Sequence, residues 1–176
     1  PDHVVAVVVT HQHPDHLDTA HLSQIFSKND SALLLGPADV LKKVDMSNKL
    51  VVQDGEKVTV APFELEFFGD LHIVIHKSIP NVQNLGVMVN DTLYYAGDSY
   101  TNPDRPVAVL ALPTSGPWLK LGEAADFAKT LKPNLAFSTH DAHLSKQGRA
   151  LVDRMLPILI ADPAVTYRRL DGSIEI

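Results

Sequence analysis

The segment His11-Gln12-His13-Pro14-Asp15-His16, directly after an apolar run at residues 4–9, decides the fold. Pro14 biases the residue before it toward extended backbone, and extended backbone points alternate side chains to one face. His11, His13 and Asp15 are therefore expected to share a face, while His16 points elsewhere. One short loop can thus offer two imidazoles to one cation, and a carboxylate with an imidazole to a second. This spacing favours a metal site over a polar surface loop.

Composition limits the alternatives. The chain has 176 residues, of which 45% are hydrophobic and 20% charged, and this balance fits one folded domain. A formal net charge of −6 disfavours a nucleic-acid partner. Without cysteine, any metal is held by histidines and carboxylates. No apolar run is long enough to span a bilayer, so we expect no membrane partner and a cytoplasmic location.

The apolar pattern predicts strands and helices that mostly alternate after an early hairpin. Strands are predicted at residues 4–9, 32–35, 50–69 with breaks, 71–75, 85–89, 92–96, 107–112, 135–138, 165–170 and 173–176, and helices at 17–27, 37–44, 121–131 and 145–160. The first strand is expected to be buried on both faces. Asp18 is expected to cap the first helix. The inward side chains of the last helix are predicted to be Leu151, Val152, Met155 and Leu159. This order indicates layered α/β structure with helices outside.

Separate elements then resemble, in order, the ligand motifs of the metallo-β-lactamase superfamily. Residues 10–16 match its H-x-H-x-D-H signature, and residues 94–99, Tyr-Tyr-Ala-Gly-Asp-Ser, resemble the strand-Gly-Asp element whose aspartate bridges two metals. Residues 138–141, Ser-Thr-His-Asp, resemble the last ligand motif. The superfamily needs one more histidine before Asp98. His72 fits best, and His76 is its rival.

The resemblance implies a dinuclear metal site. Metal 1 would be held by His11, His13 and His72. Metal 2 would be held by Asp15, His16 and His140, and Asp98 would bridge both. Since neither set contains sulfur, Zn(II) is the expected ion, with Mn(II) and Fe(II) also compatible.

The implied fold is a four-layer αββα sandwich, an α/β (α+β) arrangement. Only ten residues precede His11, whereas the first strands of the family normally come before this loop. We therefore expect one domain over residues 1–176 that lacks its N-terminal strands.

The implied activity is hydrolysis of an ester, lactone, amide or phosphoester bond of a small substrate by a metal-bridging hydroxide. Asp15 would be catalytic by orienting that hydroxide. Residues 69–72, 84–86 and 113–120 are similar to small bacterial hydrolases of the sugar-phosphate lactonase branch. Candidates for substrate contacts are Trp118, Lys120, His76 and His143, with Lys120 binding an anionic group.

Other functions stay open at this level. A nucleic-acid phosphodiesterase of the same superfamily would need a gripping surface or extra domain that the sequence does not indicate. The diiron redox branch replaces the second loop histidine with glutamate, whereas this chain has His13. A non-catalytic metal-binding scaffold is the remaining alternative. Whether the chain forms a homo-oligomer is also left open.

Overall fold

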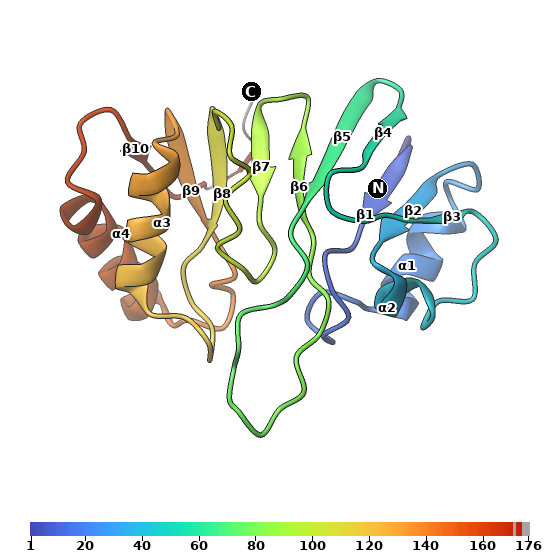
Figure 1. Ribbon diagram of the computed structural model, residues 1–176, viewed down its shortest axis with the longest axis horizontal. Helices are drawn as coiled ribbons and strands as arrows, with labels where there is room; N and C mark the ends of the chain where they lie inside the picture. The colour runs from blue at the N-terminus through green and yellow to red at the C-terminus, as the bar shows by residue number, and fades with distance from the viewer. Residues whose placement is uncertain (171, 174–176) are drawn as a thin grey trace.

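A computed structural model describes residues 1–170 and 172–173, whose strands form two sheets (Figure 1). The smaller sheet is parallel and has the order β1-β2-β3. Its strands are β1 (Ala6–Val8), β2 (Leu33–Gly36) and β3 (Lys49–Val51). Among the residues that the structure describes, β1 pairs only with β2, so it lies at an edge of this sheet.

The larger sheet has the order β10-β9-β8-β7-β6-β5-β4. Its antiparallel part contains β4 (Lys57–Val60), β5 (Phe63–Phe68), β6 (Gly86–Val89) and β7 (Leu93–Tyr95). Its parallel part continues from β7 through β8 (Val109–Pro113), β9 (Leu135–Thr139) and β10 (Thr166–Tyr167). The predicted hairpin between β6 and β7 is confirmed, and Asn90 and Asp91 both take the positive φ angles that tight hairpin turns require.

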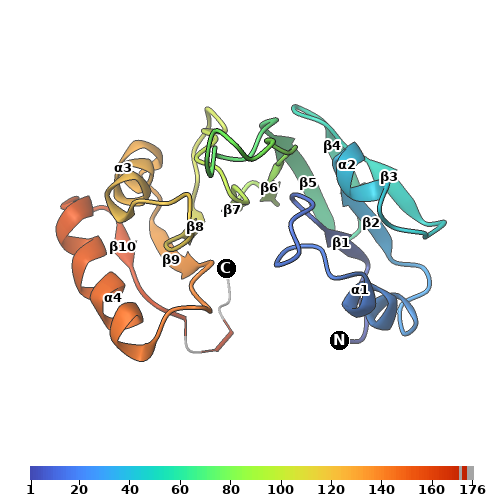
Figure 2. The same ribbon diagram turned by 90° about the horizontal axis from the view of Figure 1, so that it is seen from below.

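Four helices cover the outer faces of the sheets (Figure 2). They are α1 (Thr19–Phe26), α2 (Ala38–Leu41), α3 (Leu121–Leu131) and α4 (Lys146–Ile160). The predicted cap is confirmed, because the Asp18 carboxylate accepts hydrogen bonds from the backbone N–H groups of Ala20 and His21. In the part of the chain that the structure describes, no helix has both the length and the hydropathy needed to cross a bilayer.

Three apolar clusters fill the three interfaces of this four-layer sandwich. One joins the small sheet to α1 and α2, and includes Leu22 and Leu34. The second lies between the sheets and includes Leu35 and Phe67. The third joins the large sheet to α3 and α4 and includes Leu110. The expected αββα layering is therefore present.

Three local expectations need correction. Residues of β1 are only half-buried, not buried on both faces, because the strand lies at a sheet edge. On α4, Leu151 is 49% exposed, and Leu156 is fully buried. The prediction was therefore wrong at Leu151 and right at Val152, and it missed Leu156. Residues 71–75 form no strand beyond an isolated bridge from Leu71 to Gln83.

The C-terminal hairpin prediction is tested only in part. Its first arm contains β10, which pairs in parallel with β9. Its second arm lies mostly outside the described residues.

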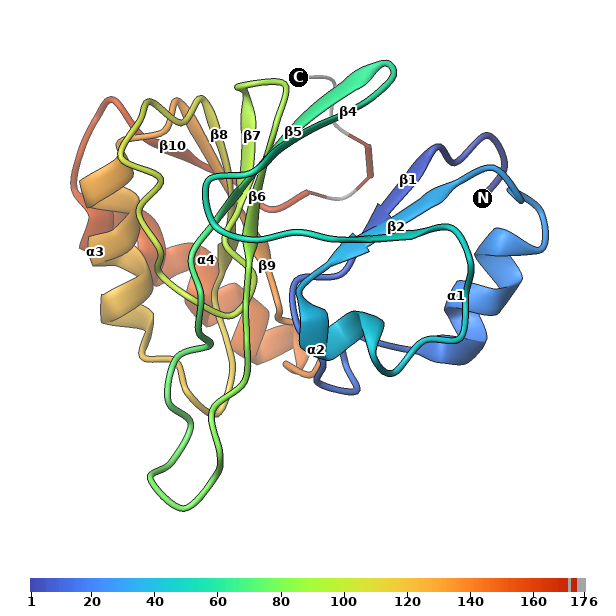
Figure 3. The same ribbon diagram turned by 45° about the vertical axis from the view of Figure 1, so that its right-hand side comes forward.

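The connection between β5 and β6 projects beyond the body of the molecule (Figures 1 and 3). Its two arms are joined at the base, where the His72 N–H donates to the Val82 carbonyl at 3.0 Å. The Asn81 side-chain amide also donates to the His72 carbonyl at 2.8 Å. Farther out, Val74 and Ile79 are 61% and 46% exposed. We call residues 73–82 the projecting loop.

Candidate metal centre

The predicted ligands come from four loops that each follow a strand. The loop after β1 carries residues 11–16, the loop after β5 carries His72, the turn after β7 carries Asp98, and His140 follows β9. Strand ends position loops rigidly, which is why functional side chains concentrate there. His140 has a left-handed backbone with φ of 58°, an uncommon conformation for a residue with a side chain.

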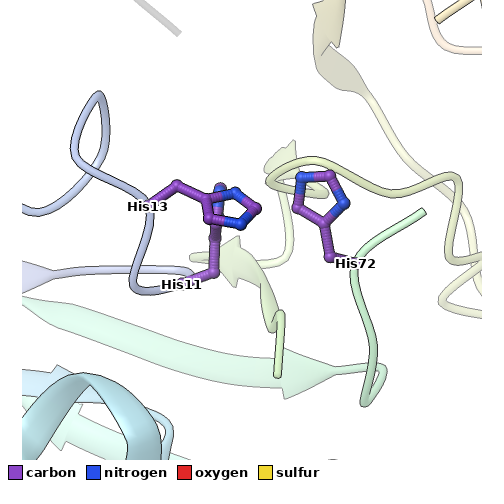
Figure 4. A group of neighbouring side chains, drawn as sticks. All are labelled: His11, His13 and His72. Carbon is purple, nitrogen blue, oxygen red and sulfur yellow. The ribbon is translucent and has the colours of Figure 1, made fainter. Parts of the chain in front are cut away.

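The structure brings these side chains into three overlapping groups. In each group, one donor atom per residue lies within 4.8 Å of the others. The groups are His11, His13 and His72; His11, His16 and Asp98; and Asp15, His16 and His140. Figure 4 shows the first group, in which the rings of His11 and His13, from the loop after β1, face His72 from the loop after β5.

Asp98 lies at the middle of the cluster. Its Oδ2 lies 3.3 Å from His72 Nε2, 3.2 Å from His140 Nε2 and 3.8 Å from His11 Nε2. Its Oδ1 lies 3.3 Å from His16 Nε2. A single carboxylate therefore touches members of both predicted ligand sets, as a bridging ligand must.

Backbone carbonyls fix two of the imidazoles. His140 Nδ1 donates to the Ser115 carbonyl at 2.6 Å, and His72 Nδ1 donates to the Ile73 carbonyl. Since a carbonyl only accepts, Nδ1 must carry the hydrogen, and Nε2 of the neutral ring is left with a lone pair. On His11, Nδ1 pairs with the Thr10 hydroxyl at 3.0 Å, a group that can donate or accept. The Nε2 atoms of His72 and His140 are thus presented to the centre as potential ligands.

The pattern of unpartnered atoms fits a metal ion. Three buried atoms at the centre form no hydrogen bond with any residue that the structure describes, namely His11 Nε2, Asp98 Oδ1 and His140 Nε2. Burying a polar atom without a partner is costly and uncommon in folded proteins. Divalent cations coordinated by these nitrogen and oxygen donors would satisfy all three.

Electrostatics show how closely the groups interact. Burial, together with the neighbouring His16, lowers the pKa of His11 to about 3. The Asp98 carboxylate raises the pKa of His140 to about 9. Burial opposes ionisation of Asp98, but the imidazoles of His140, His16 and His72 outweigh it and hold its pKa far below the usual range. Asp98 is therefore ionised at the centre of the cluster.

Asn84 holds Asp98 in place, a role that the sequence did not reveal. Its fully buried side chain accepts a hydrogen bond from the Asp98 N–H at 3.0 Å and donates one to the Ala96 carbonyl at 2.9 Å. Gly97, with φ of +66°, lies so close that an added Cβ would come within 2.3 Å of Asn84 Oδ1. The turn before Asp98 therefore requires glycine.

The residues proposed for substrate contacts occupy very different places. Trp118 is buried, and its indole N–H donates to Asp98 Oδ2 at 2.9 Å. The Lys120 side chain is 84% exposed and pairs with Glu123 at 3.3 Å. His76 is exposed and bonds to Ser78 at 2.7 Å, outside the cluster that contains its rival His72.

Only His143 of these four lines a cavity beside the ligands. The cavity has a volume of about 440 Å³ and is lined by Asp15, His16, Tyr95, His140, Ala142 and His143. The Ser115 hydroxyl bonds to His143 Nε2 at 2.8 Å, and the Ser115 carbonyl bonds to His140. Ser115 therefore positions both rings, which no sequence signal indicated.

Comparison with known proteins agrees with this geometry. Residues 1–140 match the family model described as the beta-lactamase superfamily domain. Protein Rv0786c of Mycobacterium tuberculosis is 30% identical over 151 residues, covering 83% of this chain and 71% of that protein.

Two solved structures share the fold. A Parabacteroides distasonis protein with the provisional name of metal-dependent hydrolase matches with a TM-score of 0.72 and 19% identity, over 93% of this chain and 74% of its own. CmlA, a diiron beta-hydroxylase from Streptomyces venezuelae, matches with a TM-score of 0.72 and 15% identity, over 97% of this chain and 44% of its own. With its family match, its two facing sheets and its strand-end ligand cluster, the chain belongs to the beta-lactamase superfamily and has the metallo-β-lactamase fold.

Proposed function

We propose that this protein is a metal-dependent hydrolase with a two-cation centre. The observation that carries the proposal is the sharing of one buried carboxylate, Asp98, between two sets of donor atoms. Two divalent cations bound by these sets would lower the pKa of water toward neutrality and polarise the bond under attack. The histidine and carboxylate donors suit zinc best and also accept manganese or iron.

Asp15 is the residue best placed to accept a proton from the attacking water. Its side chain is 62% exposed, lines the cavity, and has Oδ2 3.3 Å from His140 Nε2. A carboxylate in this position can orient an attacking water and accept its proton. His143, held by Ser115, lies across the same cavity and can contact the leaving group.

The cavity also suggests the charge of the substrate. Its volume of about 440 Å³ is in the range that small-molecule sites occupy. Among the described residues that line it, none is a lysine or an arginine. The lining thus offers an anionic substrate no positive charge beyond that of the proposed cations, and we favour an uncharged ester, lactone or amide over the anionic substrate that Lys120 suggested.

A hydrolysis screen tests the proposal. The protein loaded with Zn(II), Mn(II) or Fe(II) would be assayed against neutral esters, lactones and amides and against phosphodiesters of similar size. We expect chelator-sensitive hydrolysis of at least one neutral class. A metal-loaded protein that hydrolyses none of them would contradict the proposed activity, and faster cleavage of phosphodiesters would contradict the substrate class.

A further inference from the structure

The only tryptophan of the chain lies against the metal-ligand cluster. The Trp118 ring centroid lies 5.6 Å from that of His72 and 6.0 Å from that of His140. Its indole N–H donates to Asp98 Oδ2 at 2.9 Å. The tryptophan therefore touches the one carboxylate that both donor sets share.

This hydrogen bond fixes the orientation of the carboxylate. An indole N–H only donates and does not titrate, so its preference for an acceptor is the same at every pH. By holding Oδ2, Trp118 sets the plane of the carboxylate and directs the unpartnered Oδ1 toward His16, 3.3 Å away. Oδ2 stays beside His72 and His140. Each oxygen is thus assigned to its own histidines.

The indole is itself held firmly. Tyr100 packs edge-on against it with ring centroids 5.8 Å apart. On its other side, an added Cβ at Gly116 would come within 2.9 Å of the indole nitrogen. Three residues before Trp118 in the same loop, Ser115 holds His140 through its carbonyl. One loop therefore orients two proposed ligands from outside the coordination sphere.

We propose that Trp118 is a positioning residue of the metal centre, whose indole N–H holds Asp98 in the orientation needed to bridge two cations. The proposal rests on the proposed two-cation function. It assigns Trp118 a role distinct from the substrate contact expected from the sequence. Partners of metal ligands outside the coordination sphere commonly contribute a factor of 10 to 100 in metal affinity.

The test is Co(II) binding by Trp118→Phe, which keeps an aromatic ring but removes the N–H. Absorption spectra and equilibrium dialysis would measure both the coordination and the stoichiometry of Co(II). We expect the weaker Co(II) equivalent to bind about 10- to 100-fold less tightly, with an altered visible spectrum. Tyr100→Phe is the matched control, because the Tyr100 hydroxyl forms no hydrogen bond, and it should bind Co(II) like the wild type.

A second variant acts without removing the tryptophan. In Gly116→Ala, the new Cβ displaces the indole nitrogen, so the same loss of Co(II) affinity is expected while the tryptophan fluorescence remains as a check on folding. A packing role alone would lower the melting temperature of the metal-free variants and leave Co(II) affinity unchanged. Unchanged Co(II) affinity in folded Trp118→Phe or folded Gly116→Ala would overturn the positioning role of Trp118. A wild-type protein that binds no Co(II) instead overturns the two-cation centre itself.

Discussion

The two outer donor groups of the centre differ sharply in their surroundings. His11 and His72 are 0% and 3% exposed, and with the half-buried His13 they form a group that we call the buried group. Asp15 in the other group is 62% exposed at its side chain, and His16 and His140 line a cavity with it. We infer that the first group binds its cation more tightly and that the second faces the substrate.

The groups also differ in what supports them. The loop of the buried group is joined to the core by the bridge from His11 to Asn84 and by the bond from the Leu85 N–H to the Thr10 carbonyl at 3.0 Å. The exposed group depends on a polar network near the C-terminus. There Arg169 bonds to Asp141, beside His140, and to Asp153 on α4. Backbone hydrogen bonds therefore support the start of the loop at His11, and ion pairs support the segment that carries His140.

Asp98→Ala should have the largest effect, because it removes the carboxylate that joins the two halves. We expect loss of both bound cations and a fall in hydrolytic activity of roughly a thousand-fold. Metal analysis by mass spectrometry and the hydrolysis assay would measure this. If the variant kept two cations and its activity were unchanged, the assignment of Asp98 as a shared ligand would be wrong.

Substituting one proposed ligand histidine at a time should remove the cation of one donor group and leave that of the other. His140→Ala should lose one cation and keep the one in the buried group, with activity down about a hundred-fold. His72→Ala should lose the cation of the buried group, measured as metal stoichiometry after dialysis. His76→Ala is the matched control, since His76 lies outside the cluster, and equal metal loss from both histidine variants would contradict the assignment.

Asn84→Ala tests the hydrogen bonds that hold the turn before Asp98. Removing the side chain leaves the Asp98 N–H and the Ala96 carbonyl without their partners, at a cost of about 2–3 kcal/mol in the free energy of unfolding. Urea denaturation of the metal-free protein would measure the loss. Asn134→Ala, at an exposed position, should change stability little. Similar values for the two variants would show that Asn84 has no special role.

Arg169→Met should have the smallest effect. We expect the free energy of unfolding to fall by about 1 kcal/mol, because the ion pair between Arg169 and Asp153 is partly exposed. The Arg169 hydrogen bond lowers the pKa of Asp153, so the pair stabilises the fold above the ordinary carboxyl value of 3.8 and ceases to do so as the pH falls below it. Urea denaturation at pH 7 and pH 3 would measure the free energy of unfolding. The difference between the variant and the wild type should be smaller at pH 3. Arg168→Met, which removes the same charge from an exposed side chain, should show no such dependence.

Sequence reasoning reached the parts of the site that are encoded locally. The spacing from His11 to His16 and the glycine before Asp98 lie within short segments, so they were visible without a structure. The partners of those ligands were not. Asn84 and Ser115 act through contacts across 14 and 25 positions of sequence, and nothing in their neighbours signals this.

The same distinction between local and long-range information holds for the fold. Strand and helix positions followed from apolar periodicity, as the matching bounds of α3 show. The edge position of β1 did not, since strand order depends on contacts between distant segments. On α4 the apolar pattern found Val152 but not Leu156, and it wrongly turned Leu151 inward, because apolar side chains occupy neighbouring positions on this helix.

The projecting loop has a consequence for how this enzyme family can diversify. Because its two arms are joined at His72 and Val82, the outer residues can change in length or composition without moving the ligand histidine. Exposed Val74 and Ile79 add little to the core, so substitutions there carry a small stability cost. Insertions and substitutions can therefore accumulate in this loop while the placement of His72 is kept.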